Sequence, residues 1–282
     1  MESQDSEKIF ELMKNTISQR GLSFVSLNEV QRGRQAAIFL IDVIDQETGK
    51  PAKFVLKLFS KDYHHNCPTA ARHEFDVLEK FHNAVKNVNE ITCPAPIAFY
   101  ELDNGAYLMT YISGKSLEWY LAHTAIDFRD IVSRLLRGFQ IYYTAVAEIY
   151  GDFQPKNVII RECGSIGLID PTMPNPFYHQ FTVQCGPASI DMGYWLYTVA
   201  AGTAKLMVFN PKLCLRYQAF TRCLLKEAAS VFFPAREHLF LEEVIMVALS
   251  HLDRLKKKSK FKKFLLYSIG KRVIKNMVGS KK

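Results

Sequence analysis

Two aspartates and an asparagine flank a short apolar pattern in the middle of the chain. Asp152 is followed five residues later by Asn157, which opens an apolar segment at 158–160. A turn leads into a second apolar segment, 166–169, which ends at Asp170. Two strands joined by a tight turn form a hairpin, so Asn157 and Asp170 are expected to lie close together. Three oxygen-bearing side chains suit a hard cation such as Mg²⁺, whose other positions take phosphate oxygens.

The residues around this pattern resemble a known catalytic loop. Residues 150–160 read YGDFQPKNVII, and residues 166–171 read IGLIDP. They resemble the catalytic loop and metal-binding strand of the protein-kinase-like superfamily, closest to its aminoglycoside phosphotransferase and choline kinase branch. The resemblance implies that Asp152 accepts or orients the proton of an acceptor hydroxyl. It also implies that Asn157 and Asp170 hold Mg²⁺ against the nucleotide phosphates.

Three positions depart from that family's pattern. Tyr150 stands where the branch has a histidine that is not itself the base. Gln154 stands where protein kinases carry lysine and this branch commonly carries histidine. Pro171 follows Asp170 in place of a Phe-Gly pair, which is similar to the small-molecule branch rather than to protein kinases.

A lysine interrupts an otherwise apolar strand at 54–59. A buried lysine is costly unless it is paired, so Lys57 either snorkels from an edge strand or meets a carboxylate of the next helix. That helix is expected at 69–83, and its nearby carboxylates are Glu74, Asp76 and Glu79. The resemblance implies that Lys57 binds the nucleotide phosphates and that Glu74 is its partner.

Further nucleotide contacts follow from the resemblance alone. The turn at 30–36 would cover the phosphates with its backbone, although Gly33 is its single glycine. The backbone of Thr110 to Ile112 would hydrogen-bond the adenine at a hinge between two lobes. Asp191, near the start of a helix, would support the catalytic loop in a structural role.

The hydrophobic pattern predicts an α+β fold. Helical spacing is seen at 6–20 and 128–150, and the region 22–59 reads as three strands of an antiparallel meander. With the resemblance, this indicates a bilobal protein-kinase-like fold that covers roughly residues 22–200. The amino-terminal lobe would hold an antiparallel sheet with one helix, and the carboxy-terminal lobe would be mostly helical. The expected divisions are a nucleotide-binding lobe at 1–112, a catalytic and substrate lobe at 113–253 and a tail at 254–282.

Composition indicates a cytoplasmic protein. The 282 residues are 48% hydrophobic and 23% charged, and six cysteines are scattered without a C-x-x-C motif. Such spacing does not suggest a zinc site or a disulfide framework and fits a reducing compartment. No apolar run reaches the roughly 18–20 residues that span a bilayer, and the amino terminus lacks the apolar core of a signal peptide.

The net charge of +8 belongs to the end of the chain. Residues 254–282, the basic tail, hold twelve Lys and Arg and no acidic residue, which leaves 24 basic and 28 acidic residues before them. An apolar side chain recurs there every four residues: Phe261, Leu265, Ile269, Val273 and Met277. This pattern predicts a basic amphipathic helix that either binds an anionic membrane surface or packs on the preceding lobe. Nucleic acid is the least favoured partner because no other part of the chain suggests it.

These features predict a Mg²⁺-dependent phosphotransferase. It would move the terminal phosphate of ATP or GTP to a hydroxyl of a small molecule or sugar. Two alternatives stay open. The first is the same chemistry on a membrane-surface glycan or lipid-linked sugar, which would place the protein at the inner face of a membrane. The second is an inactive pseudokinase that binds a protein partner. A cationic acceptor would need carboxylates from the last helices, where four are available: Glu227, Glu237, Glu242 and Glu243.

Overall fold

The computed structural model divides the chain into two compact units. It describes residues 4–33, 35–60, 67–101, 105–124, 127–172, 180–206, 210–257 and 261–278. The first unit comprises residues 1–83 and 93–113, and the second comprises 84–92 and 114–282. The division after residue 113 falls one residue from the expected lobe boundary. The structure differs from the expectation in two respects, because residues 84–92 and the basic tail both belong to the second unit.

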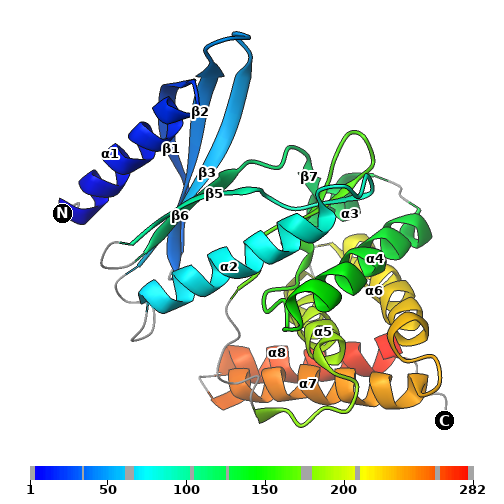
Figure 1. Ribbon diagram of the computed structural model, residues 1–282. Coiled ribbons are helices and arrows are strands. Elements are labelled where there is room, and N and C mark those ends of the chain that lie inside the picture. The colour runs from blue at the N-terminus through cyan, green and yellow to red at the C-terminus, as the bar shows by residue number, and fades with distance from the viewer. Residues whose placement is uncertain are drawn as a thin grey trace. The chain divides into compact units, whose positions relative to one another are not determined.

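The first unit is built on one antiparallel sheet, whose strands appear in blue to green in Figure 1. The sheet has five strands in the order β1-β2-β3-β6-β5. Its elements are α1 (Gln4–Gln19), β1 (Leu22–Arg32), β2 (Ala36–Asp45), β3 (Pro51–Phe59), α2 (Cys67–Val85, of which residues up to 83 belong here), β5 (Pro96–Tyr100) and β6 (Ala106–Thr110). The antiparallel meander predicted for residues 22–59 is confirmed.

Helices contact both faces of this sheet, because its central strands are apolar on both sides. Met13 of α1 belongs to a buried core with one residue from each of three strands: Ile41 of β2, Leu56 of β3 and Leu108 of β6. The opposite face carries Tyr107, whose ring lies 6.0 Å from that of Phe75 on α2. We expected one helix on the sheet and find two.

The second unit is mostly helical and includes a small four-stranded sheet in the order β4-β9-β8-β7. Its strands are β4 (Ile91–Thr92), β7 (Lys115–Ser116), β8 (Val158–Ile160) and β9 (Ile166–Leu168). Its helices are α3 (Leu117–His123), α4 (Phe128–Val146), the short 3₁₀ helix η1 (Pro155–Asn157), α5 (Pro187–Leu206), α6 (Pro211–Phe232), α7 (Glu237–Lys257) and α8 (Phe261–Val278). Residues 84–92 join this unit because β4 pairs in parallel with β9.

Helix α5 is the centre of this unit and packs against α6, α7 and α8 (Figure 1). It is apolar on nearly every side, which is typical of a helix surrounded by protein. Trp195 and Leu196 are fully buried, and the Trp195 indole donates a hydrogen bond of 3.1 Å to the hydroxyl of Thr221 on α6. Helix α4 ends at Val146, four residues before Tyr150, because Ala147 adopts a left-handed conformation that closes the helix.

The described part of the basic tail packs on the second unit. In α8, Val273, Ile274 and Met277 are buried, whereas Lys271, Arg272 and Lys275 are exposed. Helix α8 contacts α5, α6 and α7. The side chains of Phe261 and Leu265 lie outside the described residues. Of the two expectations for this helix, packing is therefore seen for its carboxy-terminal half.

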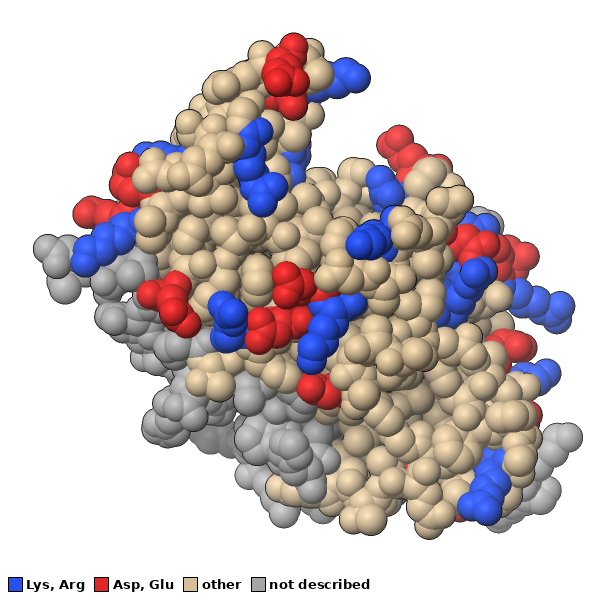
Figure 2. Space-filling model, in the orientation of Figure 1, with Lys and Arg blue, Asp and Glu red and all other residues tan. Residues whose placement is uncertain are grey.

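The α+β class is confirmed, with eight α-helices and the five-stranded antiparallel sheet in the described part of the chain. No helix among the described residues combines the length and the hydropathy needed to cross a bilayer. On the face drawn in Figure 2, the described basic and acidic side chains are interspersed and form no broad basic patch.

Candidate functional site

The hairpin that was predicted from the apolar segments is present. Strands β8 and β9 pair antiparallel with Val158 opposite Leu168. One step further, the Ile169 N–H donates to the Asn157 carbonyl at 3.1 Å. Asn157 therefore precedes the first strand at the same end of the hairpin where Asp170 follows the second.

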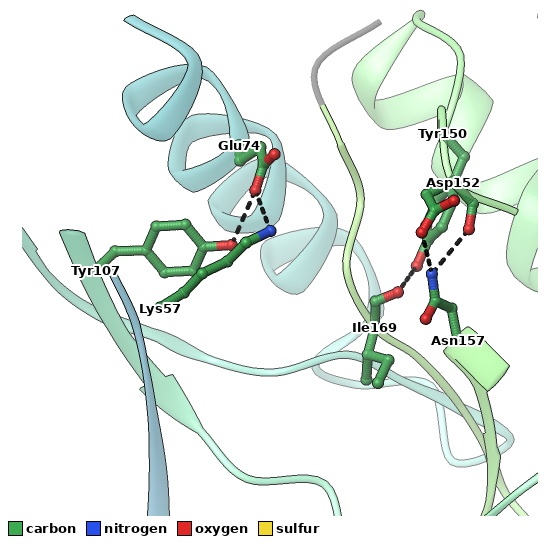
Figure 3. Close-up of polar contacts among 7 residues, drawn as sticks. All are labelled: Lys57, Glu74, Tyr107, Tyr150, Asp152, Asn157 and Ile169. Carbon is green, nitrogen blue, oxygen red and sulfur yellow. Dashed lines mark hydrogen bonds and ion pairs between the residues drawn. The ribbon is translucent and has the colours of Figure 1, made fainter. Parts of the chain in front are cut away.

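Asn157 is buried and clamps the loop that carries Asp152. Its amide Nδ2 donates to the Asp152 carboxylate at 2.9 Å and to the Asp152 carbonyl at 2.8 Å. This orientation directs the amide oxygen of Asn157 away from Asp152, as Figure 3 shows. Asn157 thus holds the loop through one end of its amide and presents an oxygen at the other.

The Asp152 carboxylate accepts hydrogen bonds from three side chains. Besides Asn157 on Oδ2, Gln154 Nε2 lies 2.6 Å and the Tyr194 hydroxyl 3.1 Å from Oδ1. A carboxylate offers about four lone-pair positions, so the three donors among the described residues leave one for a further donor. The three donors fix the orientation of the carboxylate, which suits a group that must accept one particular hydroxyl.

Asp170 lies in an unusual backbone conformation. Its φ is +64°, one of two positive values among the non-glycine residues that the structure describes. Asp is among the residues that tolerate this region, and such conformations concentrate at functional sites. The preceding residue is anchored, because the Tyr150 hydroxyl donates a short hydrogen bond to the Ile169 carbonyl (Figure 3). Tyr150 therefore ties the Asp152 loop to the strand end that leads into Asp170.

Gly151 is required by a close approach between two backbone segments. Its φ is +90°, and a Cβ atom there would lie 2.5 Å from the Thr172 carbonyl oxygen. The Thr172 N–H donates to the Tyr150 carbonyl at 3.0 Å. The residue after Tyr150 must therefore be glycine for the loop to pass beside the segment that follows Asp170.

Asp191 supports the loop from α5. Its carboxylate accepts from the N–H groups of Tyr150 at 2.7 Å and Gly151 at 3.0 Å, and from the Tyr143 hydroxyl at 2.8 Å. The sequence placed Asp191 near a helix start, but α5 begins four residues earlier, at Pro187, so Asp191 serves the loop rather than the helix terminus. Burial raises its pKa to about 6, and the three hydrogen bonds oppose that rise.

We expect Asp191 to make the folded protein less stable as the pH rises. The folded state holds this proton more tightly than the unfolded chain, where the pKa is near 3.8. Below pH 3.8 the Asp191 carboxyl therefore makes its full contribution to the free energy of unfolding. This contribution is lost as the pH rises through about 6. The difference amounts to roughly 2–3 kcal/mol in the free energy of unfolding. Urea denaturation at several pH values checks it.

The Asp191→Asn variant isolates this contribution. It should lose the dependence between these pH values while being about 1–3 kcal/mol less stable, because one buried donor loses its acceptor. Asp253→Asn, at an exposed position, is the matched control. A parent protein that loses stability relative to Asp191→Asn as the pH falls would contradict the expected sign.

Lys57 and Glu74 form a buried ion pair in the first unit. The two charged atoms lie 2.6 Å apart, and the side chains are 4% and 1% exposed. The Tyr107 hydroxyl donates to the same carboxylate oxygen at 3.3 Å (Figure 3). Asp76, the alternative partner, pairs with Arg72 instead.

The position of β3 decides between the two hypotheses for Lys57, a lysine that snorkels from an edge strand and a lysine paired with a carboxylate. Lys57 lies opposite Ile38 of β2 on one side and Tyr107 of β6 on the other, so its strand is internal. A snorkelling lysine on an edge strand is therefore excluded. An internal lysine that keeps a buried carboxylate is costly to maintain, which is why such pairs are functional candidates.

Gly33 and the backbone of residues 110–112 were the remaining expected nucleotide contacts. A Cβ atom at Gly33 would have ordinary contacts, so no close approach requires glycine there. The N–H groups of Thr110 and Tyr111 already donate to Ala95 and Lys53. Ile112 lies beyond the strand, and its N–H bonds to no other described residue.

Asp152, Asn157 and Asp170 fit Mg²⁺ by their chemistry. All three offer oxygen ligands, which hard cations prefer, and the Asn157 oxygen points away from its own hydrogen bonds. Among the described residues, no group of three or more His, Cys, Asp or Glu could hold a metal ion. Two or three protein oxygens together with phosphates nonetheless suffice for magnesium.

The sequence analysis did not predict that Tyr194 would bind the Asp152 carboxylate. Tyr194 lies three residues after Asp191 on α5, so the two side chains leave the same face of the helix. Asp191 binds the backbone of the loop, and Tyr194 binds its carboxylate. A tyrosine at this spacing from the supporting aspartate was the available signal.

The chain matches no protein-family model and no curated protein sequence. The residues of the site therefore carry the functional argument by themselves.

Proposed function

We propose that the protein is a Mg²⁺-dependent phosphotransferase that moves the terminal phosphate of ATP or GTP to a hydroxyl of a small molecule or sugar. The observation that carries the proposal is the clamped Asp152 loop at the end of the hairpin. The Asp152 carboxylate is oriented by the Asn157 amide nitrogen, and Asn157 lies at the end of the hairpin where Asp170 follows the second strand. The resemblance of residues 150–171 to the protein-kinase-like superfamily supports the same conclusion.

Each residue has a role that its surroundings support. Asp152 would accept a hydrogen bond from the acceptor hydroxyl at its remaining lone pair. Asn157 and Asp170 would hold Mg²⁺, which neutralises phosphate charge when bound. Lys57, fixed by Glu74, would bind the nucleotide phosphates through its ammonium group.

The reaction is balanced by one proton transfer. The acceptor oxygen forms a bond to the terminal phosphorus, and the bond from that phosphorus to the nucleoside diphosphate breaks. The acceptor hydroxyl gives its proton to Asp152 or through it to solvent. Such transfers depend on positioning and charge neutralisation more than on covalent help from the protein.

An acceptor at a membrane surface is the second proposal. It is supported by the exposed Lys271, Arg272 and Lys275 of α8. Because Val273, Ile274 and Met277 are buried in the second unit, this part of α8 would bind anionic lipid through charge and not by insertion. A pseudokinase without turnover is the outcome if nucleotide binds and no transfer follows.

The metal assignment is tested by nucleotide binding. We expect ATP or GTP with Mg²⁺ to raise the thermal midpoint of the parent, because a ligand that binds only the folded state stabilises it. Asp170→Ala should lose the Mg²⁺-dependent part of the rise, since a phosphate-bound cation loses a charged ligand. Asp253→Asn should behave as the parent. If Asp170→Ala binds the Mg²⁺ nucleotide as the parent does, the metal assignment is wrong.

A further inference from the structure

A small cavity lies in the second unit beside the Asp152 loop. Its volume is about 120 Å³. Residues from α3, the loop, α5 and α6 line it: Glu118, Gln154, Pro155, Lys156, Thr198, Val199, Gly202, Thr203 and Tyr217. A cavity of roughly 150 Å³ holds one benzene ring, so this smaller hollow would enclose only one part of a six-membered ring and leave the rest outside it.

Gln154 connects the cavity to the proposed reaction centre. Gln154 is one of the residues that line the cavity, and its amide nitrogen lies 2.6 Å from Asp152 Oδ1. Asp152 is not among the described lining residues, but it is hydrogen-bonded to Gln154, which is. A hydroxyl carried by a ligand in the cavity past Gln154 would reach the remaining lone pair of the Asp152 carboxylate.

The lining combines an apolar wall with hydrogen-bonding groups of both kinds. Tyr217 is buried and contributes an aromatic ring to the lining, and Glu118 contributes a carboxylate. Val199 adds apolar surface. The Thr198 hydroxyl donates to the Trp195 carbonyl and the Gln154 amide donates to Asp152, and each side chain also carries an oxygen that can accept from a ligand hydroxyl. Ring hydroxyls pair with such groups, while the carbon face of a ring packs on the apolar wall.

The charges of the lining balance. Glu118 and Lys156 contribute one charge of each sign, and no arginine is among the described residues that line the cavity. A phosphorylated ligand would call for arginines or several cations, and a polycation would call for several carboxylates.

The carboxylates suggested for a cationic acceptor do not line this cavity. Glu243 accepts from the N–H groups of Gln184 at 2.6 Å and Cys185 at 3.1 Å, which is a structural role. Glu227 lines a different hollow, together with Arg129. A neutral ligand is therefore favoured.

We infer that this cavity is the acceptor subsite and that it takes a neutral, polyhydroxylated ring such as a monosaccharide unit, a conclusion that rests on the proposed phosphotransferase function. The ring hydroxyl nearest Asp152 would become the phosphate ester. Its oxygen forms the new bond to phosphorus, the nucleoside diphosphate leaves, and the proton passes to Asp152.

Gly202 allows a direct test because it faces the cavity. A Cβ atom there would meet no heavy atom within 4 Å, so a larger side chain can enter without moving the backbone of α5. Replacement of a helical glycine also favours the helix. Gly202→Leu should therefore fill the cavity in a protein that stays folded, as checked by its thermal midpoint.

The experiment measures sugar binding directly, without nucleotide. Ligand-observed saturation-transfer NMR is recorded with a mixture of glucose, galactose, mannose and N-acetylglucosamine on the full chain. We expect a signal with the parent, a loss of at least about tenfold in affinity with Gly202→Leu, and a loss within about threefold with Gly202→Ala, which adds only a methyl group. Glucose 6-phosphate and kanamycin are the anionic and cationic comparisons.

The outcomes separate this inference from the proposed function. If the parent binds Mg²⁺ nucleotide while Gly202→Leu binds the sugars as the parent does, the subsite is wrong and the function stands. If sugars bind in the cavity but no nucleotide binds, the function fails and the sugar site stands. Stronger competition by glucose 6-phosphate or kanamycin than by neutral sugars would overturn the ligand class.

Discussion

Replacing Asp152 with asparagine should lower the turnover of bound Mg²⁺ nucleotide by at least about 10³-fold, within the range seen when a positioned proton acceptor is lost. The carboxylate accepts from Asn157, Gln154 and Tyr194, so its orientation is fixed before any acceptor arrives. Asparagine has a similar shape but lacks the charge, and its amide nitrogen cannot accept. Turnover is measured as release of nucleoside diphosphate, with water or a sugar as the acceptor.

The affinity for the nucleotide distinguishes this role from a metal ligand. With Asp152→Asn, we expect the dissociation constant of the Mg²⁺ nucleotide to change by less than about fivefold, a free-energy difference near 1 kcal/mol. Asp253→Asn removes an exposed carboxylate and is the control for an aspartate-to-asparagine change away from the site. Normal turnover by Asp152→Asn would remove Asp152 from the reaction and leave the clamped loop with a purely structural role.

Replacing Lys57 with methionine should destabilise the first unit by about 3–5 kcal/mol, the range measured when one partner of a buried ion pair is removed. The Glu74 carboxylate is 1% exposed and would lose the cation that lies 2.6 Å from it, while the Tyr107 hydroxyl still donates to it at 3.3 Å. A buried carboxylate without a cation is disfavoured, so the variant should unfold more readily or bind a proton. Nucleotide affinity should fall as well if Lys57 binds the phosphates.

The partner variant tests whether the loss belongs to the pair. We expect Glu74→Gln together with Lys57→Met to recover at least about 1–2 kcal/mol relative to Lys57→Met alone, because no buried charge is left. Both tryptophans, Trp119 and Trp195, lie in the second unit. Their fluorescence therefore reports unfolding of the second unit and not of the first, which contains Lys57. Urea denaturation followed by circular dichroism, with hydrogen exchange of the β3 amides, reports the first unit. A loss below about 1 kcal/mol for Lys57→Met would contradict the buried pair.

Local patterns made the hairpin and the ion pair predictable. The apolar segments before Asp170 are short and bounded by turn residues, so their pairing follows from the sequence. Lys57 was informative because a charge inside an apolar strand needs a partner, and Glu74 lay at a suitable place on the next helix. In both cases the partners are separated by fewer than about twenty residues, where geometry limits the choices.

Longer-range contacts were not predictable in the same way. The contact of Tyr194 with Asp152 depends on how α5 packs below the loop, which no local pattern encodes. The assignment of residues 84–92 to the second unit depends on the two-residue strand β4, too short to show a period. The basic tail was ambiguous because an amphipathic helix can bury its apolar face in lipid or in protein, and only packing decides between them.

The most direct test of the central claim is nucleotide turnover by the parent protein. Release of ADP or GDP is measured with and without Mg²⁺, first with water as the only acceptor and then with a panel of sugars, aminoglycosides and lipid-linked glycans. The proposed function predicts Mg²⁺-dependent release that rises when the right hydroxyl compound is added, and transfer of the phosphate to that compound. Binding of the Mg²⁺ nucleotide without release under any of these conditions would contradict the claim and identify the protein as a pseudokinase.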